Sequence, residues 1–296
     1  MDADHCARRD RVTPDDAQIA TSVRSVQSLA LVDRWPVDNV ASAVVSGTGE
    51  VLAGHGDLDR VFPLASVTKL ITAYAALVAL GEGVAELDDP AGPPGATIRH
   101  LLAHASGVTL DSDMVVARPG TRRIYSNAGF EILADTLAER SDIAFAEYVT
   151  DGVLDPLGMG STTFEGSPAS GAASSVADLA RFAAEVQRPS LVDPALVAEA
   201  RRVVFPGLPG VLPGYGRQDP NDWGLGFEIR DHKRPHWTGS ANSAETFGHF
   251  GQSGTFLWVD PRAGAACVVL TDRGFGPWAI DAWPAFADAV LAELGS

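Results

Sequence analysis

The sequence predicts an α/β protein in which the two ends of the chain form a sheet domain and the middle forms an inserted helical subdomain. Strand-like segments occur over 40–54 and again over 224–271, whereas short helical patterns separated by loops rich in proline and glycine fill the middle. With 296 residues, the chain is long enough for one large core or two subdomains. We therefore expect a sheet domain over 1–87 and 214–296, and a helical subdomain over 88–213.

The N-terminal elements follow from capping residues and from hydrophobic spacing. A Thr-Pro-Asp-Asp run supplies a cap, a proline for the first turn and acids for the positive end of a helix, and apolar residues then recur at helical spacing. This pattern predicts a helix over 13–33, preceded by a mobile tail over 1–12. Two strand-like segments, 40–46 and 51–54, are joined by a Gly-Thr-Gly-Glu turn, which predicts a β-hairpin.

The remaining elements are predicted in the same way. Helical patterns occupy 98–104, 127–140, 144–150, 176–187 and 194–203. No strong strand pairs are evident among them. Strands are predicted over 224–230, 254–259 and 265–271, and a final helix over 278–294.

Composition narrows the possible functions. The formal net charge of −16 at pH 7 disfavours binding to nucleic acid or to an anionic membrane surface. The two cysteines, Cys6 and Cys267, lie far apart in the sequence, so we expect inert thiols and no disulfide framework. The chain start lacks a secretory apolar run, and the most apolar stretch, 70–80, is about half the length needed to cross a bilayer. We expect a cytoplasmic protein that acts on a small molecule, with no metal or cofactor.

Lys69 is the most informative residue. Among the 22 basic residues only Lys69 and Lys233 are lysines, and a lysine in such an arginine-rich background suggests a group that must lose a proton. Lys69 lies in an almost entirely apolar segment that predicts a buried helix from Ser66 to Gly81 or Gly83. Burial lowers the pKa of an amine unless the charge is paired.

Ser66 precedes Lys69 by three residues, so on a helix the hydroxyl and the amine share a face. Ser66 also falls in the first turn, where free backbone N–H groups and the helix dipole favour negative charge. A nucleophile, a base and part of an oxyanion site are thus predicted within four residues. The same pattern fits a serine helix cap followed by an exposed lysine, and taken alone it leaves both interpretations open.

Tyr125 and Asn127 lie at the start of the predicted helix over 127–140. A phenol beside Lys69 can relay the Ser66 proton, and an amide can orient Lys69 or hold a substrate carbonyl. The alternative is a helix cap beside a partly buried aromatic residue.

A third group, 249–252, precedes the predicted strand at 254. His249 can donate to a substrate oxygen or tune the Lys–Tyr pair, and the Gln252 N–H can complete an oxyanion hole with that of Ser66. Gly251 allows a substrate to approach the backbone closely. A lone histidine here is otherwise a structural residue at a strand end.

These groups together resemble the penicillin-recognising serine hydrolases, in particular the branch of class C β-lactamases, D-Ala-D-Ala carboxypeptidases and family VIII-type esterases. The resemblance rests on seven segments in family order: FPLASVTK at 62–69, LLAHASG at 101–107, YSNAG at 125–129, SVADLA at 175–180, WGLGF at 223–227, FGHFG at 247–251 and WVDP at 258–261. It implies a β-lactamase/transpeptidase-like fold, in which helices flank an antiparallel sheet and an all-helical subdomain is inserted. It also implies an acyl-enzyme on Ser66, a proton relay of Lys69 and Tyr125, and supporting roles for Asn127 and His249.

One departure from this family pattern bears on the substrate. The middle position of the third motif usually carries Thr or Ser, whose hydroxyl helps to hold a substrate carboxylate, but here it is Phe250. This change, together with the negative net charge, favours neutral substrates with apolar acyl groups over anionic β-lactams or peptide C-termini. We therefore predict an esterase-like serine hydrolase. The alternatives are a β-lactamase or D-Ala-D-Ala carboxypeptidase, and a catalytically silent binding module on the same fold.

His100 and His104 are spaced i, i+4 and can in principle bind zinc. No glutamate follows His100 as in H-E-x-x-H, so we interpret both as structural and predict no metal site.

Overall fold

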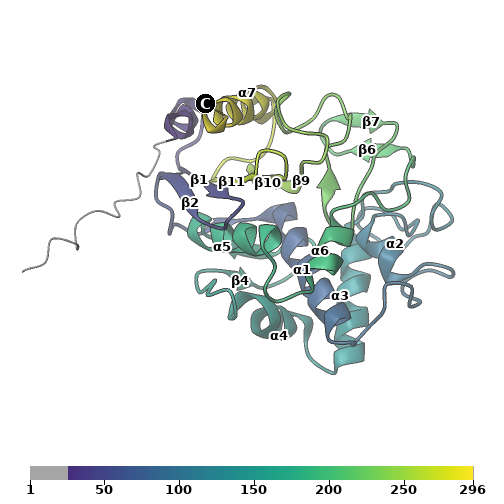
Figure 1. Ribbon diagram of the computed structural model, residues 1–296. Coiled ribbons are helices and arrows are strands. Elements are labelled where there is room, and N and C mark those ends of the chain that lie inside the picture. The colour runs from purple at the N-terminus through teal and green to yellow at the C-terminus, as the bar shows by residue number, and fades with distance from the viewer. Residues whose placement is uncertain (1–25, 296) are drawn as a thin grey trace, which may run out of the picture.

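The computed structural model describes residues 26–295 and has a six-stranded antiparallel sheet at its centre (Figure 1). In sheet order, the strands are β2 (Val51–His55), β1 (Val40–Ser46), β11 (Ala265–Thr271), β10 (Thr255–Asp260), β9 (Phe247–Gly251) and β8 (Glu228–Ile229). The N-terminal hairpin therefore pairs with the last strand, β1 against β11. This arrangement confirms the α/β class and the antiparallel sheet with flanking helices.

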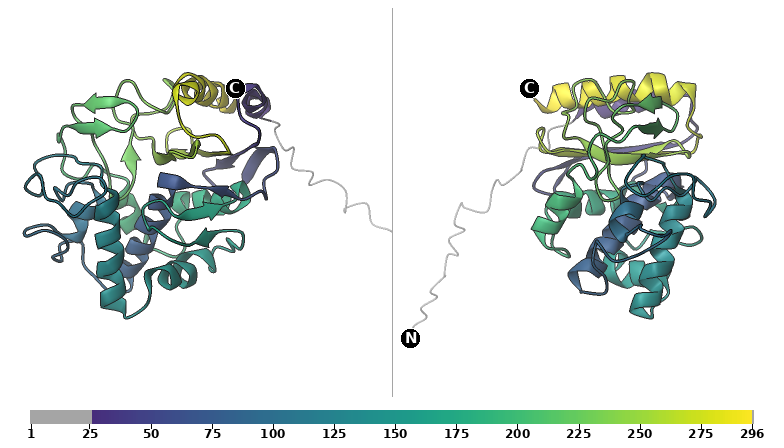
Figure 2. Two further views of the ribbon diagram at one scale, coloured as in Figure 1. Left: turned by 180° about the vertical axis from the view of Figure 1, so that it is seen from behind. Right: turned by 90° about the vertical axis from the view of Figure 1, so that its right-hand side faces the viewer.

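Helices cover both faces of the sheet (Figure 2). The C-terminal helix α7 (Pro277–Leu294) and the 3-10 helix η1 (Gln27–Arg34) lie on one face, and α1 (Thr68–Gly81) and α5 (Val176–Gln187) lie on the other. Every residue of β10 and of β11 is buried, as expected for strands with apolar layers on both sides. Two separate hydrophobic cores result, one on each side of the sheet.

The described residues also form further helices and two smaller sheets. The helices are α2 (Ile98–Leu102), α3 (Asn127–Ser141), α4 (Phe145–Val149), α6 (Pro194–Ala200), the 3-10 turn η2 (Ala65–Val67) and the π-helical turn η3 (Thr150–Leu154). The short strands are β3 (Phe62–Pro63), β4 (Thr163–Phe164), β5 (Ala172–Ser174), β6 (Gly210–Leu212) and β7 (Gly216–Gln218). In the part of the chain that the structure describes, no helix is both long and apolar enough to span a membrane.

Several predicted elements differ from the observed ones. The strand predicted over 224–230 is reduced to β8 because Gly226 has a positive φ of 81° that breaks the extended backbone. The third motif, expected to precede a strand, lies on one, β9. Residues 88–213 contain the short strand pair β4–β5, where no strong strand pairs were expected.

The predicted N-terminal helix is only partly testable. Its residues up to 25, the tail over 1–12 and Cys6 lie outside the described residues, and η1 occupies the rest as a 3-10 helix. The division into a sheet domain and a helical subdomain stays a prediction. Helix α5, which belongs to the predicted helical subdomain, packs on strand β1 of the sheet.

Candidate active site

Ser66 lies in a tight turn that links β3 to α1. The preceding residue, Ala65, has a φ of 46°, a left-handed conformation that a non-glycine residue adopts only where its surroundings enforce it. The turn is held by Thr255, whose hydroxyl donates to the Leu64 carbonyl at 2.9 Å. Strand β9 passes so close that a Cβ on Gly251 would lie 2.3 Å from the same carbonyl oxygen. Gly251 therefore lets β9 pack against the Ser66 turn.

Lys69 is fully buried one helical turn after Ser66. Its Nζ lies 2.7 Å from Asn127 Oδ1, 2.9 Å from the Ala169 carbonyl oxygen and 3.4 Å from Ser66 Oγ. Burial lowers the pKa of Lys69 to about 7, although the carboxylates of Asp111 and Glu131 act in the opposite direction. A substantial fraction of this amine is therefore neutral at physiological pH.

Tyr125 lies just before α3, which Ser126 caps by accepting a hydrogen bond of 2.8 Å from the Gly129 N–H. The Tyr125 hydroxyl donates to Ser66 Oγ at 2.8 Å. Lys69 Nζ lies 4.7 Å from the centre of the Tyr125 ring. Burial raises the pKa of Tyr125 above its ordinary value, so the resting side chain is a neutral phenol.

His249, on β9, approaches the same phenol. Its Nε2 lies 3.3 Å from the Tyr125 hydroxyl, and its Nδ1 donates to the Phe250 carbonyl at 2.6 Å. Burial and the charge of Lys69 lower the pKa of His249 to about 3. The neutral ring with its proton on Nδ1 presents a lone pair at Nε2. Donation from Nε2 to a substrate oxygen, one of the two expected roles, is therefore not open to this ring.

Asn127 connects Lys69 to a residue that the sequence reasoning did not identify. Its Oδ1 accepts from Lys69, and its Nδ2 donates to Oδ1 of Asp111 at 2.7 Å. The Ala169 carbonyl beside Lys69 was also not predicted. Neither residue belongs to a recognisable motif, and only tertiary contacts bring them to the site.

A cavity of about 260 Å³ opens beside Ser66. Its lining includes six of the predicted site residues: Ser66, Tyr125, Asn127, His249, Phe250 and Gln252. The structure thus brings together side chains that lie far apart in the sequence. Gly251 lies against the turn that carries Ser66.

Five further residues line this cavity: Leu110, Leu212, Pro213, Trp223 and Glu228. Glu228 is the charged one. Its carboxylate accepts from Lys233, from His236 at 2.9 Å and from the Trp237 indole N–H at 3.0 Å. Burial alone would raise the pKa of Glu228, but His236 and Lys233 outweigh it and hold that pKa below its usual range. Glu228 is therefore a fixed, fully hydrogen-bonded anion in the wall.

Phe250 has a second, structural environment. Its ring packs beneath α7, with ring centres 4.9 Å from Phe275 and 5.9 Å from Trp283. Phe250 therefore anchors the wall of the cavity in the apolar core as well as lining it.

The two histidines considered for zinc each use their Nδ1 in a hydrogen bond, and the buried His104 Nε2 has no hydrogen-bond partner among the described residues. His100 Nδ1 pairs with Thr97 Oγ1 at 2.9 Å and its ring stacks on Phe205, whereas His104 Nδ1 accepts from the Ser126 N–H at 3.1 Å. Within residues 26–295, no group of three or more His, Cys, Asp or Glu side chains could hold a metal ion. Cys267 lies buried in β11, where burial raises its thiol pKa.

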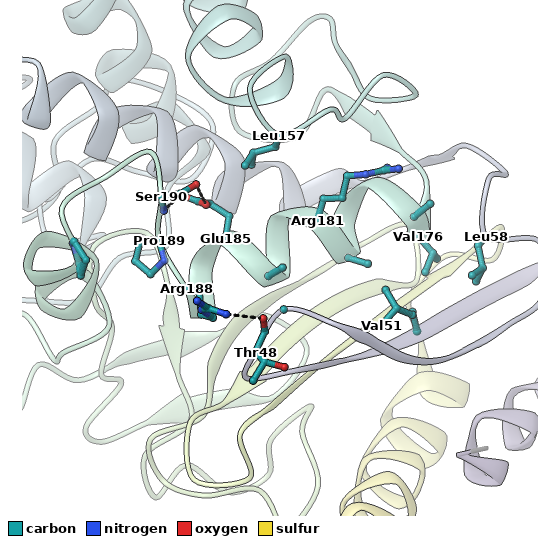
Figure 3. Close-up of a pocket in the computed structure, with 16 residues that line it drawn as sticks. Thr48, Val51, Leu58, Leu157, Val176, Arg181, Glu185, Arg188, Pro189 and Ser190 are labelled. Carbon is teal, nitrogen blue, oxygen red and sulfur yellow. Dashed lines mark hydrogen bonds between the residues drawn. The ribbon is translucent and has the colours of Figure 1, made fainter. Parts of the chain in front are cut away.

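A larger cavity of about 780 Å³ lies between the β1–β2 turn and α5 (Figure 3). Its polar groups serve the fold. The Arg188 guanidinium donates to the Thr48 carbonyl, and the Ser190 hydroxyl donates to Glu185, which also accepts from the buried Tyr74 hydroxyl. This cavity therefore presents no activated nucleophile.

The fold and this constellation are those of a serine hydrolase. Residues 39–291 match the family model described as Beta-lactamase, and the chain belongs to the β-lactamase family. The crystal structure of a β-lactamase, Mb2281c from Mycobacterium bovis, is 59% identical, superposes with a TM-score of 0.89, and is matched over 90% of this chain and 99% of that one.

More distant relatives carry different activities in their names. The D-alanyl-D-alanine-carboxypeptidase/endopeptidase AmpH of Escherichia coli K12 is 28% identical over 210 residues, which are 50% of this chain and 54% of AmpH. The chain thus spans about half the length of that curated relative. EstCE1, a hydrolase with promiscuous acyltransferase activity, shares the fold at a TM-score of 0.70 and 18% identity, covering 90% of this chain and 97% of EstCE1.

Proposed function

We propose that the protein hydrolyses neutral carboxylic esters through a covalent acyl-enzyme on Ser66. Lys69 is the general base for the first step, and Tyr125 is the acid that protonates the leaving oxygen. Asn127 orients Lys69 through its amide oxygen, and His249 positions Tyr125 through the contact between their rings. The observation that carries this proposal is the convergence of a near-neutral amine and a neutral phenol on one serine oxygen.

The hydrogen bonds around Lys69 favour proton transfer from Ser66. A neutral amine has two N–H groups and one lone pair. The two shorter contacts, to Asn127 Oδ1 and to the Ala169 carbonyl, go to atoms that only accept, so they take the two N–H groups. The lone pair then faces Ser66 Oγ at 3.4 Å, a distance that can shorten when substrate binds.

In acylation, Ser66 Oγ attacks the ester carbonyl carbon as its proton passes to Lys69. The bond to the leaving oxygen breaks, and Tyr125 transfers its proton to that oxygen, which leaves as the alcohol. The resulting phenolate is stabilised by the Lys69 ammonium 4.7 Å from its ring. We propose that the backbone N–H groups of Ser66 and Gln252 donate hydrogen bonds to the carbonyl oxygen of the ester, and so form the oxyanion hole.

In deacylation, the Tyr125 phenolate removes a proton from water, which attacks the acyl carbon. The bond to Ser66 Oγ breaks, and Lys69 returns its proton to that oxygen. The products are the carboxylic acid and the free enzyme, so both proton donors regain their resting states. The raised pKa of Tyr125 makes its phenolate a strong base for this step.

The charges around the cavity support a neutral substrate. None of the described residues that line it is an arginine or a lysine, and its charged member is the anion Glu228. A substrate carboxylate would find no cation there to pair with. Phe250 adds an apolar surface at the position where the resembled family usually carries the hydroxyl of Thr or Ser.

Turnover of a β-lactam is the second candidate, and one observation favours it: the Mycobacterium bovis protein described as a β-lactamase is 59% identical to this chain. D-Ala-D-Ala carboxypeptidase activity, suggested by the similarity to AmpH, belongs with this candidate. Both use the same Ser66, Lys69 and Tyr125 chemistry with a different leaving group. The cytoplasmic location predicted from the sequence also stays a prediction.

Parallel kinetics separate these candidates. We expect kcat/KM for a short-chain alkyl ester to exceed that for a chromogenic cephalosporin or a D-Ala-D-Ala peptide, and both activities to vanish in Ser66→Ala. Faster turnover of the β-lactam would reverse the assignment. A fluorophosphonate that labels the wild type but not Ser66→Ala establishes the nucleophile. Failure to label a folded wild type would instead indicate a catalytically silent binding module.

A further inference from the structure

A second cavity, of about 590 Å³, lies beside the catalytic one and shares with it Leu110, Tyr125 and Pro213. We call this second cavity the vestibule. Its volume lies within the range of small-molecule sites. Tyr125, whose hydroxyl reaches Ser66, lines both spaces.

The vestibule is lined mainly by apolar side chains: Leu110, Val116, Ile124, Pro209, Val211 and Pro213. Three of them are unusually exposed for aliphatic residues, Leu110 at 46%, Val116 at 51% and Val211 at 60%. They come from two distant parts of the chain, the loop before α3 and the strand β6. Exposed apolar residues that gather in one concavity at a catalytic centre indicate a ligand surface.

The two sides of the vestibule are joined by Arg123. Its N–H donates to the Pro209 carbonyl at 3.0 Å, and its buried guanidinium donates to main-chain carbonyls that include Asn221 at 3.0 Å and Val204 at 2.8 Å. A buried guanidinium satisfied by carbonyls holds these segments in a fixed arrangement. The vestibule is therefore preformed.

The charged residues that line the vestibule are arginines, of which Arg123 donates to main-chain carbonyls and Arg217 lies in an ion pair. Besides the buried Arg123, it is lined by two exposed arginines, Arg122 and Arg217. Arg217 pairs with Asp219 at 3.1 Å. The continuous part of the lining is apolar, which fits an uncharged chain.

We propose that the vestibule binds the alcohol portion of the ester, and that the preferred substrates are esters of aliphatic alcohols about four to eight carbons long. This inference rests on the proposed function. Tyr125 is assigned to protonate the leaving oxygen, so that oxygen must lie next to the phenol. The group attached to it then continues along the Tyr125 ring into the vestibule, away from Phe250 and Gln252.

Two series of esters test this assignment. One varies the alcohol, as ethyl, butyl and hexyl acetate, and the other varies the acid, as ethyl acetate, butanoate and hexanoate. We expect kcat/KM to rise along the alcohol series, by up to roughly fourfold for each methylene that is fully buried. Along the acid series we expect a markedly smaller rise.

Substitution of the walls locates the effect. Val211→Asp and Val116→Asp, on separate elements, should each bring the ratio of hexyl to ethyl acetate kcat/KM close to one. This ratio does not depend on how much of a preparation is active. Val61→Asp is the matched control, since Val61 is 49% exposed and lines neither cavity, and it should keep the wild-type ratio.

The outcomes are distinct. A flat alcohol series, a steeper acid series, or a wild-type ratio in both vestibule variants overturns the inference, while hydrolysis of ethyl acetate with labelling of Ser66 leaves the proposed function standing. If neither series is hydrolysed and Ser66 is not labelled, the proposed function fails and this inference fails with it.

Discussion

Asp111 Oδ1 accepts a hydrogen bond of 2.7 Å from Asn127 Nδ2, and this contact determines which end of the amide faces the active site. Because the carboxylate can only accept, the NH₂ group points to Asp111 and the oxygen is left for Lys69, 2.7 Å away. Asp111 thereby influences Lys69 through Asn127, without a direct hydrogen bond to the amine. Its charge also opposes the fall in the Lys69 pKa that burial causes.

This relationship predicts the pH dependence of the enzyme. Lys69 must be neutral to accept the Ser66 proton, so kcat/KM should rise as the pH increases through about 7. In Asp111→Asn a negative charge near Lys69 is removed while a side-chain acceptor remains, so the Lys69 pKa should fall and the rise should occur at lower pH. The pH profile of kcat/KM for a neutral ester measures this shift.

Asp113→Asn, on the same exposed loop, is the control and should leave the profile in place. Because Asp111 is exposed, the shift between wild type and Asp111→Asn should shrink at high salt. A profile that stays unchanged or moves to higher pH in Asp111→Asn would contradict the assigned relationship.

Local parts of the fold and site could be predicted from the sequence. Ser66 and Lys69 are three residues apart, and helix geometry alone brings such positions together. Strand β11 and helix α5 were predicted with their observed bounds because their hydrophobic patterns are regular. Tyr125 and His249 entered as candidates from their residue types and, together with Ser66 and Lys69, from the family resemblance.

Features that depend on long-range contacts could not be predicted. Strand β9 was missed because Gly248 and Gly251 weaken its strand pattern, although close packing against other backbone segments requires glycine there. The Ala169 carbonyl contacts Lys69 and Asp111 contacts Asn127, each from a loop with no motif, so only the tertiary structure identifies them.

Lys69→Arg tests the requirement for an amine that can lose its proton. A guanidinium keeps its charge at any accessible pH, so it cannot accept the Ser66 proton, and we expect kcat/KM to fall by about 10²–10⁴-fold. The near-ultraviolet circular dichroism spectrum should show that the fold is largely retained. Ser66→Ala gives the background rate of the assay, against which residual activity is measured. Turnover near the wild-type level in a folded Lys69→Arg protein would disprove the role of Lys69 as the base.

Tyr125→Phe tests the acid that protonates the leaving group. For an alkyl ester, whose alkoxide needs a proton to depart, we expect kcat to fall by about 10²–10⁴-fold. For an aryl ester such as p-nitrophenyl acetate, which expels a stable phenolate, we expect a much smaller loss in the rate of acylation, measured as the pre-steady-state burst.

Tyr215→Phe is the matched control for this experiment. Tyr215 is a buried phenol that packs against Phe250, and within the described part of the chain its hydroxyl has no hydrogen-bond partner. Its removal should affect neither ester. Equal losses for the alkyl and aryl esters in Tyr125→Phe would show that the phenol positions Ser66 instead of supplying the proton.

Gly251→Ala tests the close packing of β9 against the turn that carries Ser66. The added Cβ would lie 2.3 Å from the Leu64 carbonyl oxygen and 2.6 Å from Thr255 Oγ1, so the turn that carries Ser66 must move. We expect the free energy of unfolding to fall by about 1–3 kcal/mol, as for overpacked cores. We also expect kcat/KM to fall by about 10²-fold, since a displacement of about 1 Å is enough to misalign a nucleophile.

Gly160→Ala, where a Cβ meets no heavy atom within 4 Å, is the control and should change neither the free energy of unfolding nor kcat/KM. Urea unfolding and ester kinetics on the two variants measure both effects, and wild-type kinetics in Gly251→Ala would show that the Ser66 turn does not depend on this contact.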